Sequence, residues 1–301
     1  MLKKIQNLNF LLIFLITLVS FIGAAGLYSA AGGSYEPWAS RHLIRVFVFI
    51  LLSITIAFID IRIIYKYSYI IFILSLLLLL SVEIIGVFGK GATRWISIFG
   101  FSLQPSELIK ISIILALAKF YNDLKFENIK NIIYLFFPFI ILFFPFILVV
   151  IQPDLGTALS IIILGILILF ACGIRIWKFV FGFIVILISI PLLLNFLKPY
   201  QKDRVISFLN PEADALGAGY QLIQSKIALG SGGLTGKGFL EGTQSYLQYL
   251  PEKQTDFIFT LIGEEFGFIG TIFIILLFLI IITVCFYISI KSNHIFGRII
   301  S

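Results

Sequence analysis

Long apolar runs without charge recur along the whole chain, and they limit its fold more than any other feature. Five runs contain no charged residue at all: residues 9–31, 132–151, 155–174, 179–197 and 266–290. About 20 helical residues cross the hydrocarbon core of a bilayer, and backbone groups in lipid have to pair within their own segment. We therefore predict that each run forms a transmembrane helix.

Three further apolar runs bring the predicted spans to eight, although each carries one to three charged residues: residues 43–59, 64–88 and 105–121. The composition agrees, since 60% of the 301 residues are apolar and 12% are charged, whereas about 25% of residues are charged in soluble domains. The sequence thus predicts an all-α, polytopic helical integral membrane protein, with residues 1–301 in a single membrane domain.

Basic residues in the short connections predict the orientation of these spans. Most of them lie on the same side as the N-terminus, and cytoplasmic loops are typically rich in Lys and Arg. The N-terminus is therefore expected in the cytoplasm, and residues 198–256 become a large extracytoplasmic loop. The net charge of +7 is attributed to the cytoplasmic segments, so no nucleic-acid partner is expected. The 2 cysteines exclude a disulfide framework and a Cys-rich metal site.

An ionisable pair opens the run at 105–121. Glu107 and Lys110 are three residues apart, so they share one face of a helix and can pair. Ionisable residues in a span have to be satisfied by each other or face water. An internal ion pair and a direct substrate contact both stay open. Arg94, at the outer interface, either attracts phosphate or anchors the chain together with Trp95.

Two further stretches offer polar groups at the outer side. Asp154 precedes the run at 155–174, where it either caps the helix or positions a cation or a sugar hydroxyl. The glycine-rich stretch 230–238 contains Lys237 but lacks the glycine and the hydroxyl residue of a Walker motif, which excludes ATP hydrolysis. Its glycines are expected to let backbone amides approach a ligand.

Asp256 stands where the polar loop gives way to the last apolar helix. A partly desolvated carboxylate suits a general base that works near neutral pH. The alternative is a helix cap, for which Thr255 competes. His42 and His294 are expected on opposite sides of the membrane, so a His-based triad or metal cluster cannot form.

These stretches, in this order, resemble the motifs of the SEDS family (shape, elongation, division and sporulation), which includes RodA, FtsW and SpoVE. The matching motifs are Gly-Ala-Thr-Arg-Trp at 91–95, Gln-Pro-Ser-Glu at 104–107 with Lys110, Gln-Pro-Asp-Leu-Gly-Thr at 152–157, Gly-Ser-Gly-Gly at 230–233, and Pro-Glu at 251–252 with Thr-Asp-Phe at 255–257. Within the family, the stretches at 200–204, 208–211 and 242–244 resemble RodA more than FtsW.

The resemblance implies a peptidoglycan glycosyltransferase that polymerises lipid II at the outer face of the cytoplasmic (inner) membrane, for cell elongation and rod shape. It implies that Asp256 is the essential aspartate, that Glu107 and Lys110 form the family's helix ion pair, and that Asp154 is a second important acid. Candidates to offset the pyrophosphate charge are Arg94, Lys110, Arg204 and Lys237. A divalent cation such as Mg²⁺ is a candidate cofactor.

The resemblance also implies partners, namely a class B penicillin-binding protein (a transpeptidase) and other membrane proteins of the elongation complex. Family members generally have ten spans, whereas this chain ends after the eighth predicted span. The expectation is therefore a membrane domain truncated at its C-terminus. Two alternative functions are a lipid II flippase, which needs polar groups along a path through the membrane, and a noncatalytic scaffold for cell-wall synthesis.

Overall fold

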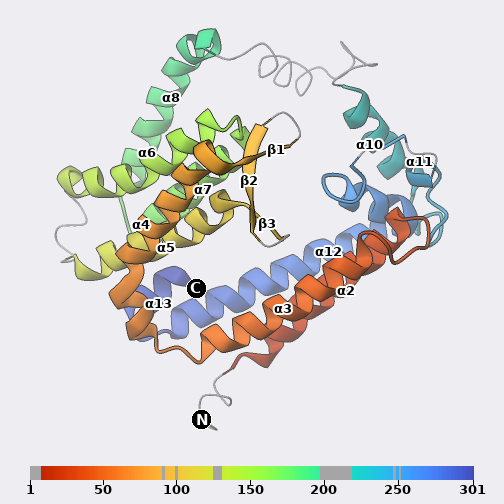
Figure 1. Cartoon of the computed structure of the whole chain (residues 1–301), viewed down its shortest axis with the longest axis horizontal. Helices are drawn as coiled ribbons and strands as arrows, with labels where there is room; N and C mark the ends of the chain where they lie inside the picture. Colours follow the sequence, from red (N-terminus) through yellow and green to blue (C-terminus); the bar gives the residue numbers. More distant parts are fainter. Residues whose placement is uncertain are drawn as a thin grey trace. The chain divides into compact units, whose positions relative to one another are not determined.

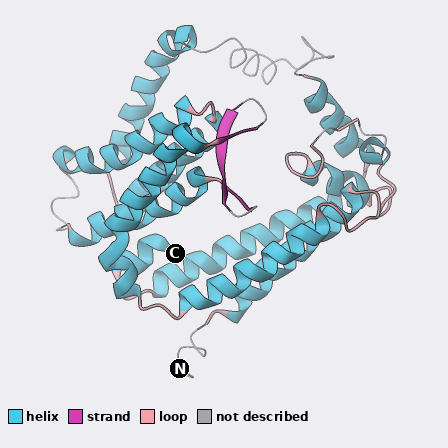
Figure 2. Ribbon diagram, viewed as in Figure 1, coloured by secondary structure: helices cyan, strands magenta, loops and turns pink. Residues whose placement is uncertain are grey.

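The computed structural model describes residues 8–89, 92–98, 101–124, 131–196, 219–246, 249–250 and 252–301. Helices dominate these residues, and the strands form one small sheet (Figure 2). The elements in chain order are α2 (Phe10–Ala30), α3 (Ala39–Ala57), α4 (Ile61–Ile85), β1 (Val87–Gly89), β2 (Ala92–Ile98), β3 (Phe101–Leu103), α5 (Pro105–Asp123), the 3-10 helix η2 (Ile132–Leu135), α6 (Phe136–Ile151), α7 (Leu155–Ala171), α8 (Ile176–Phe196), α10 (Tyr220–Ser231), α11 (Thr243–Tyr246), α12 (Ile258–Lys291) and α13 (Ile295–Ile300).

Every predicted span coincides with a helix in the described part of the chain. Five of these helices are long and apolar enough to cross a membrane, namely α2, α3, α4, α12 and the helical stretch Ile133–Ile151 that contains α6. The apolar helix α7 and the stretch Ile176–Val185 of α8 are shorter. Helix α5 is less apolar because it carries Glu107, Lys110, Lys119 and Asp123. The prediction of a multi-pass, helical membrane protein is confirmed.

A small antiparallel sheet in the order β1-β2-β3 follows α4. Val87 lies opposite Trp95, and Ile96 lies opposite Leu103. The predicted span at 64–88 is therefore wrong at its end, because α4 stops at Ile85 and its C-cap residue Gly86 is extended. The β-branched and aromatic residues that follow favour strands when they can pair with a neighbour. The apolar run at 64–88 does not show that a strand follows it, because the pairing of β2 with β3 depends on residues beyond that run.

The chain divides into two compact units. Unit 1 comprises Met1–Phe58 and Ser189–Cys285, and unit 2 comprises Ile59–Ile188 and Phe286–Ser301. In unit 2, helices α4, α5, α6 and α7 lie together beside the sheet (Figure 1). Their buried side chains form one core that includes Ile109, Ile113 and Ile161. This core holds the starts of α5 and α7 in place, and β2 contacts α4 and α5.

In unit 1, helix α2 runs alongside both α3 and α12 (Figure 1). Ala30 at the end of α2 packs with Leu261, Ile262 and Ile274 of α12. A Cβ on Gly26 would stand 3.4 Å from the Ile258 side chain, an ordinary van der Waals distance, so α2 and the start of α12 are in direct contact there. The start of α12, which follows Asp256, is thereby anchored to the first membrane helix.

Candidate functional site

Helix α12 is broken at Gly267. This residue has φ 65° and ψ −161°, a backbone conformation that is accessible essentially only to glycine. In an unbroken helix, the N–H groups of Phe268 and Ile269 would bond to the carbonyls of Glu264 and Glu265. The break separates these four groups. A broken helix in a membrane protein needs other partners for its freed backbone groups.

The glycine-rich loop supplies those partners. Lys237 N–H donates to the Glu264 carbonyl at 3.0 Å, and Gly238 N–H donates to the Glu265 carbonyl at 3.0 Å. In the other direction, Phe268 N–H donates to the Gly233 carbonyl at 2.9 Å and Ile269 N–H to the Leu234 carbonyl at 3.1 Å. Four bonds to the loop thus replace the two helical bonds that the break removes.

Close backbone contact explains why this loop is rich in glycine. Gly236 has φ +84°, and a Cβ there would collide with the Glu265 carbonyl. A Cβ on Gly232 would likewise collide with the Gly263 carbonyl. The sequence predicts that these glycines let backbone amides approach a ligand. The structure corrects this prediction, because at these positions the backbone approaches α12 instead.

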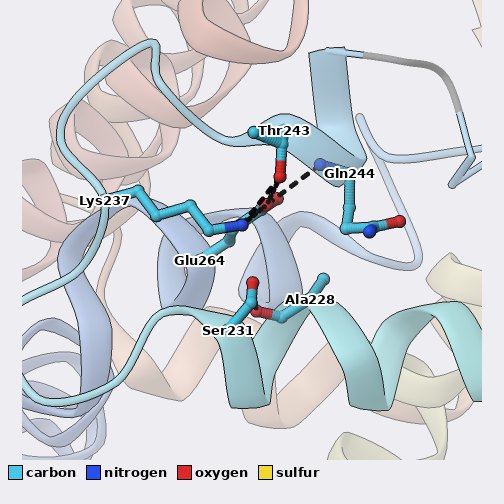
Figure 3. A network of polar contacts seen from close by, with 6 residues as sticks. All are labelled: Ala228, Ser231, Lys237, Thr243, Gln244 and Glu264. Atoms are coloured by element: carbon cyan, nitrogen blue, oxygen red, sulfur yellow. Dashed lines mark hydrogen bonds and ion pairs between the residues drawn. The ribbon is translucent and has the colours of Figure 1, made fainter.

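The same loop is held by a buried carboxylate, shown in Figure 3. The Glu264 side chain is 0% exposed, and its Oε1 accepts from Lys237 Nζ at 2.8 Å. Thr243 Oγ1 donates to the same oxygen at 3.2 Å, and the backbone N–H of Gln244 donates at 2.9 Å. Lys237 also donates to Thr243 Oγ1 at 2.7 Å. Lys237, a predicted phosphate ligand, therefore serves first as the counter-ion of Glu264.

Asp256 lies just before α12 and is exposed. The backbone bonds at the helix start are Ile258 N–H to the Thr255 carbonyl at 3.4 Å and Leu261 N–H to the Phe257 carbonyl at 3.1 Å. Thr255 Oγ1 donates to the Glu252 carbonyl at 3.3 Å. In the part of the chain that the structure describes, the Asp256 carboxylate has no hydrogen bond or ion pair. Its oxygens are accessible to a ligand.

In unit 2, a second group of motif residues surrounds the turn between α6 and α7. Arg94 on β2 donates from Nε to the Gln152 carbonyl at 3.2 Å and from Nη2 to the Pro153 carbonyl. Gln152 is buried, and its Nε2 donates to the Leu79 carbonyl at 3.2 Å. Two motifs far apart in the sequence, at 91–95 and 152–157, thus meet at this turn. Arg94 positions backbone here and spends two of its five N–H donors on it.

Asp154 caps α7, as one of its two predicted roles requires. Its Oδ1 accepts from Thr157 N–H at 3.3 Å, and its Oδ2 accepts from Thr157 Oγ1 at 2.9 Å. Gln104 Nε2 also donates to Oδ2, at 3.3 Å. Asp154 therefore connects the start of α7 to the residue that precedes α5.

The predicted ion pair at the start of α5 forms. Lys110 Nζ lies 2.8 Å from Glu107 Oε1, with side chains that are 24% and 56% exposed, respectively. Pro105 occupies the first position of the helix, and Glu107 lies in its first turn, where a negative charge is favourable. The pair is accessible, and it does not require burial of both charges.

The structure brings the predicted residues together in two separate groups. Lys237 and Asp256 belong to unit 1, whereas Arg94, Glu107, Lys110 and Asp154 belong to unit 2. Arg204 and the stretches at 200–204 and 208–211 lie outside the described residues. Among the described residues, no group of three or more His, Cys, Asp or Glu side chains could hold a metal ion.

Glu264 and Glu265 hold this part of the molecule together, although they are not among the site residues predicted from the sequence. Glu265 is 2% exposed and accepts a hydrogen bond from Ser29 Oγ at the end of α2. Two acids next to an apolar run do indicate a special role, because ionisable residues in a membrane span are energetically unfavourable unless they have a function or a partner. Their partners lie 20 to 236 residues away in the sequence, so the pairing could not be inferred from it.

Comparison with known proteins identifies the family. The family model for cell cycle proteins that covers FtsW, RodA and SpoVE matches residues 4–301. The chain is 41% identical over 230 residues to peptidoglycan glycosyltransferase MrdB of Escherichia coli (strain K12), which covers 74% of this chain and 60% of that protein. It is 38% identical over 301 residues to a probable peptidoglycan glycosyltransferase FtsW of Wigglesworthia glossinidia brevipalpis, covering 96% of this chain and 78% of that relative. The chain thus spans about three fifths of the length of MrdB.

Solved structures agree on the fold. A chain from a structure described as "Structural coordination of polymerization and crosslinking by a peptidoglycan synthase complex" matches with a TM-score of 0.82 at 25% identity, covering 98% of this chain and 82% of that chain. The rod shape determining protein RodA of Thermus thermophilus matches with a TM-score of 0.70 at 22% identity, covering 98% and 79%, respectively. The chain belongs to the FtsW, RodA and SpoVE family of cell cycle proteins.

Proposed function

We propose that this protein is a peptidoglycan glycosyltransferase that polymerises lipid II into glycan strands, for cell elongation and rod shape. Two observations support the activity. The motifs of the family are present, and relatives named as peptidoglycan glycosyltransferases are 38% to 41% identical. The RodA-like stretches of the sequence and the match to MrdB support the role in elongation.

The observation that carries the proposal is the state of Asp256. A general base needs a carboxylate within hydrogen-bond reach of the proton it removes. Asp256 is exposed and, within the described residues, is not engaged by any other group. The nearby acids differ, because Glu264 is held by Lys237 and Glu265 by Ser29. The Asp256 carboxylate is therefore open to a substrate hydroxyl, whereas the carboxylates of Glu264 and Glu265 are buried and held by other residues.

The proposed reaction is an inverting glycosyl transfer. The 4-hydroxyl of the acceptor GlcNAc attacks the anomeric carbon of the donor MurNAc, and its proton passes to the Asp256 carboxylate. The bond from the anomeric carbon to the lipid pyrophosphate breaks, and the pyrophosphate leaves with the electron pair. The candidates that the sequence provides to stabilise that charge are Arg94, Lys110, Arg204 and Lys237. Bound Mg²⁺ would supply further positive charge.

The proposal includes an orientation and a partner. We place Asp256 and the loop at 198–256 on the outer side of the cytoplasmic membrane and the N-terminus in the cytoplasm. The reason is that most Lys and Arg residues of the short connections lie on the same side as the N-terminus, as is typical of cytoplasmic loops. A class B penicillin-binding protein is the proposed partner, together with other membrane proteins of the elongation complex. The match to a chain from a peptidoglycan synthase complex supports this partner.

Polymerisation of lipid II by the purified protein tests the activity. The unaltered protein should convert lipid II into glycan strands that are visible by electrophoresis. Asp256→Asn should reduce the rate by about 10²-fold or more, the loss expected when a general base is removed. Glu241→Gln changes another exposed carboxylate of the same unit and should retain the wild-type rate.

The two failures of this test have different meanings. If Asp256→Asn polymerises at the wild-type rate, another residue is the base. If the unaltered protein makes no glycan, the activity itself is excluded, and a lipid II flippase or a noncatalytic scaffold takes its place.

A further inference from the structure

Unit 1 contains a cavity of about 710 Å³ between α2, the loop that follows it, and α12. Its lining includes Ser29, Glu36, Trp38, Leu240, Lys253 and Glu265. Volumes of 300 to 1,000 Å³ are typical of sites for small molecules. Asp256 does not line the cavity, although it is three residues from Lys253 on the segment that precedes α12. The cavity is therefore adjacent to the proposed base in the sequence and separate from it.

One oxygen in this cavity requires a partner. Glu265 is 2% exposed, and Ser29 Oγ donates to its Oε1. Its other oxygen, Oε2, is buried and has no hydrogen-bond partner among the described residues. The Leu240 backbone amide contributes a hydrogen-bond interaction to the carboxylate, and the Lys253 ammonium group attracts it electrostatically. A buried polar atom without a hydrogen bond is costly, so such atoms mark places where a bound molecule belongs.

The charges around the cavity limit what that molecule can be. Glu36 and Glu265 would repel an anion, and Lys253 would repel a cation. Desolvation lowers the pKa of Lys253, so this side chain is already in an environment that disfavours further positive charge. A neutral ligand that carries both donors and acceptors avoids both conflicts. It can donate to Glu265 and accept from Lys253.

The other residues that line the cavity leave a space that suits a ring-shaped group of a ligand. Trp38 is half-buried and packs against the core of α12, which fixes its position. Ala30, Ala31, Gly32 and Gly242 leave space around it because their side chains are small. Aromatic lining with a few placed polar groups is typical of sites that orient a small molecule. Hydroxyl and amide groups around a ring with apolar C–H faces, as in an N-acetylated amino sugar, match this combination.

We propose that this cavity binds an N-acetylated sugar ring of the substrate and that Glu265 Oε2 accepts a hydrogen bond from one of its hydroxyl or amide groups. The assignment deepens the proposed function and rests on it only for the identity of the lipid-linked sugar. Glu265 is here a binding residue that selects and orients the sugar. Proton transfer stays with Asp256.

Binding of a soluble sugar tests the site without any polymerisation. The probe is N,N′-diacetylchitobiose, added to the purified protein in detergent micelles and followed by titration calorimetry. Hydrogen bonds to charged groups correspond to about a tenfold or larger change in affinity. Glu265→Gln should therefore raise Kd by about tenfold, whereas the matched control Glu241→Gln should not change it.

The position of the sugar is tested independently of Glu265. Replacing Trp95 and Trp177 with Phe leaves Trp38 as the single tryptophan, because the chain has 3. The probe should change the Trp38 fluorescence with a midpoint equal to the Kd. This measurement also decides the case if Glu265→Gln does not fold.

Lipid II in nanodiscs distinguishes a lipid-linked sugar from a free one. In the polymerisation assay, Glu265→Gln should raise KM by about tenfold and leave kcat within a few fold. A structural defect would lower the active fraction, and hence kcat, instead. If the unaltered protein binds the soluble sugar but makes no glycan, the proposed function is wrong while the sugar site stands. No binding of the probe, an equal Kd for Glu265→Gln, or unchanged Trp38 fluorescence would overturn the inference and leave a water-filled cavity.

Discussion

Lys237 Nζ lies 2.8 Å from Oε1 of Glu264, a carboxylate whose side chain has 0% exposure. The two residues come from the glycine-rich loop and from the first part of α12, so this ion pair attaches the loop to the helix. Thr243 and the Gln244 amide complete the set of donors around the same oxygen. Removing the donors of a buried carboxylate leaves its charge uncompensated and lowers the stability of the folded protein.

Lys237→Met should destabilise the protein by about 2 kcal/mol. The loss is smaller than for a fully buried pair, because the Lys237 side chain is 26% exposed and Glu264 keeps its neutral donors. Denaturant unfolding in detergent would measure it. Lys226→Met, at an exposed position of α10, is the matched control and should have little effect. If the double variant with Glu264→Gln is destabilised by the full sum of the two single changes, the side chains are not coupled.

The ion pair between Glu107 and Lys110 should contribute little to stability. Its side chains are 56% and 24% exposed, and exposed pairs contribute about 0.2 to 1 kcal/mol. Glu107→Gln and Lys110→Met should therefore each leave unfolding nearly unchanged. Polymerisation then separates the two roles left open by the sequence. A large loss of activity without a loss of stability would indicate a substrate contact, and unchanged activity would indicate a local structural pair.

Gly267→Ala should be strongly unfavourable. The conformation of Gly267 costs a residue with a Cβ about 1 to 3 kcal/mol, and the new Cβ would also collide with the backbone of Gly236 and Leu234. Gly230→Ala is the control, since Gly230 lies in α10 with no atom within 4 Å of an added Cβ. That change should be neutral or slightly stabilising, because alanine favours helix. Equal stability of the two variants would contradict the break in α12.

Thiol labelling of intact cells tests the proposed orientation. After replacement of Cys172 and Cys285 with Ala, a cysteine is introduced at Glu241 or at Arg175, both exposed. A membrane-impermeant reagent should label the cysteine at 241 and should leave the one at 175 unlabelled until the cells are opened. The reversed pattern would place the glycine-rich loop in the cytoplasm and would remove Asp256 from the side where we propose that glycan is made.

The helices were accessible to sequence reasoning because each depends on a local pattern. An uncharged run such as 9–31 predicts a helix by its length and apolarity alone, and α2 occupies it. The strands were not accessible in the same way, since Ile96 acquires its partner Leu103 only when the chain turns back. The break in α12 has a local sign, a glycine inside an apolar run, but glycine is also tolerated in membrane helices.

In the candidate site, too, local contacts could be predicted from the sequence and long-range contacts could not. The sequence predicts the cap at Asp154 and the pair of Glu107 with Lys110, whose partners are each three residues away, and both contacts form. It could not predict that Lys237 meets Glu264 or that Ser29 meets Glu265, because those contacts depend on how α12 and the loop pack. Long-range pairing of buried charges is set by the fold, and charge alone does not identify the partner.

Because hydrogen bonds to the glycine-rich loop replace helical bonds at Gly267, hydrogen exchange at two backbone amides of α12 reports whether the loop is attached. Phe268 and Ile269 donate to Gly233 and Leu234, so their protons can exchange with solvent only when the loop detaches. Exchange at these two positions should therefore match exchange at Lys237 and Gly238, whose amides are protected by the same contact. A shared rate would show that the glycine-rich loop and the broken helix open as one cooperative unit, so that any displacement of the loop also bends α12.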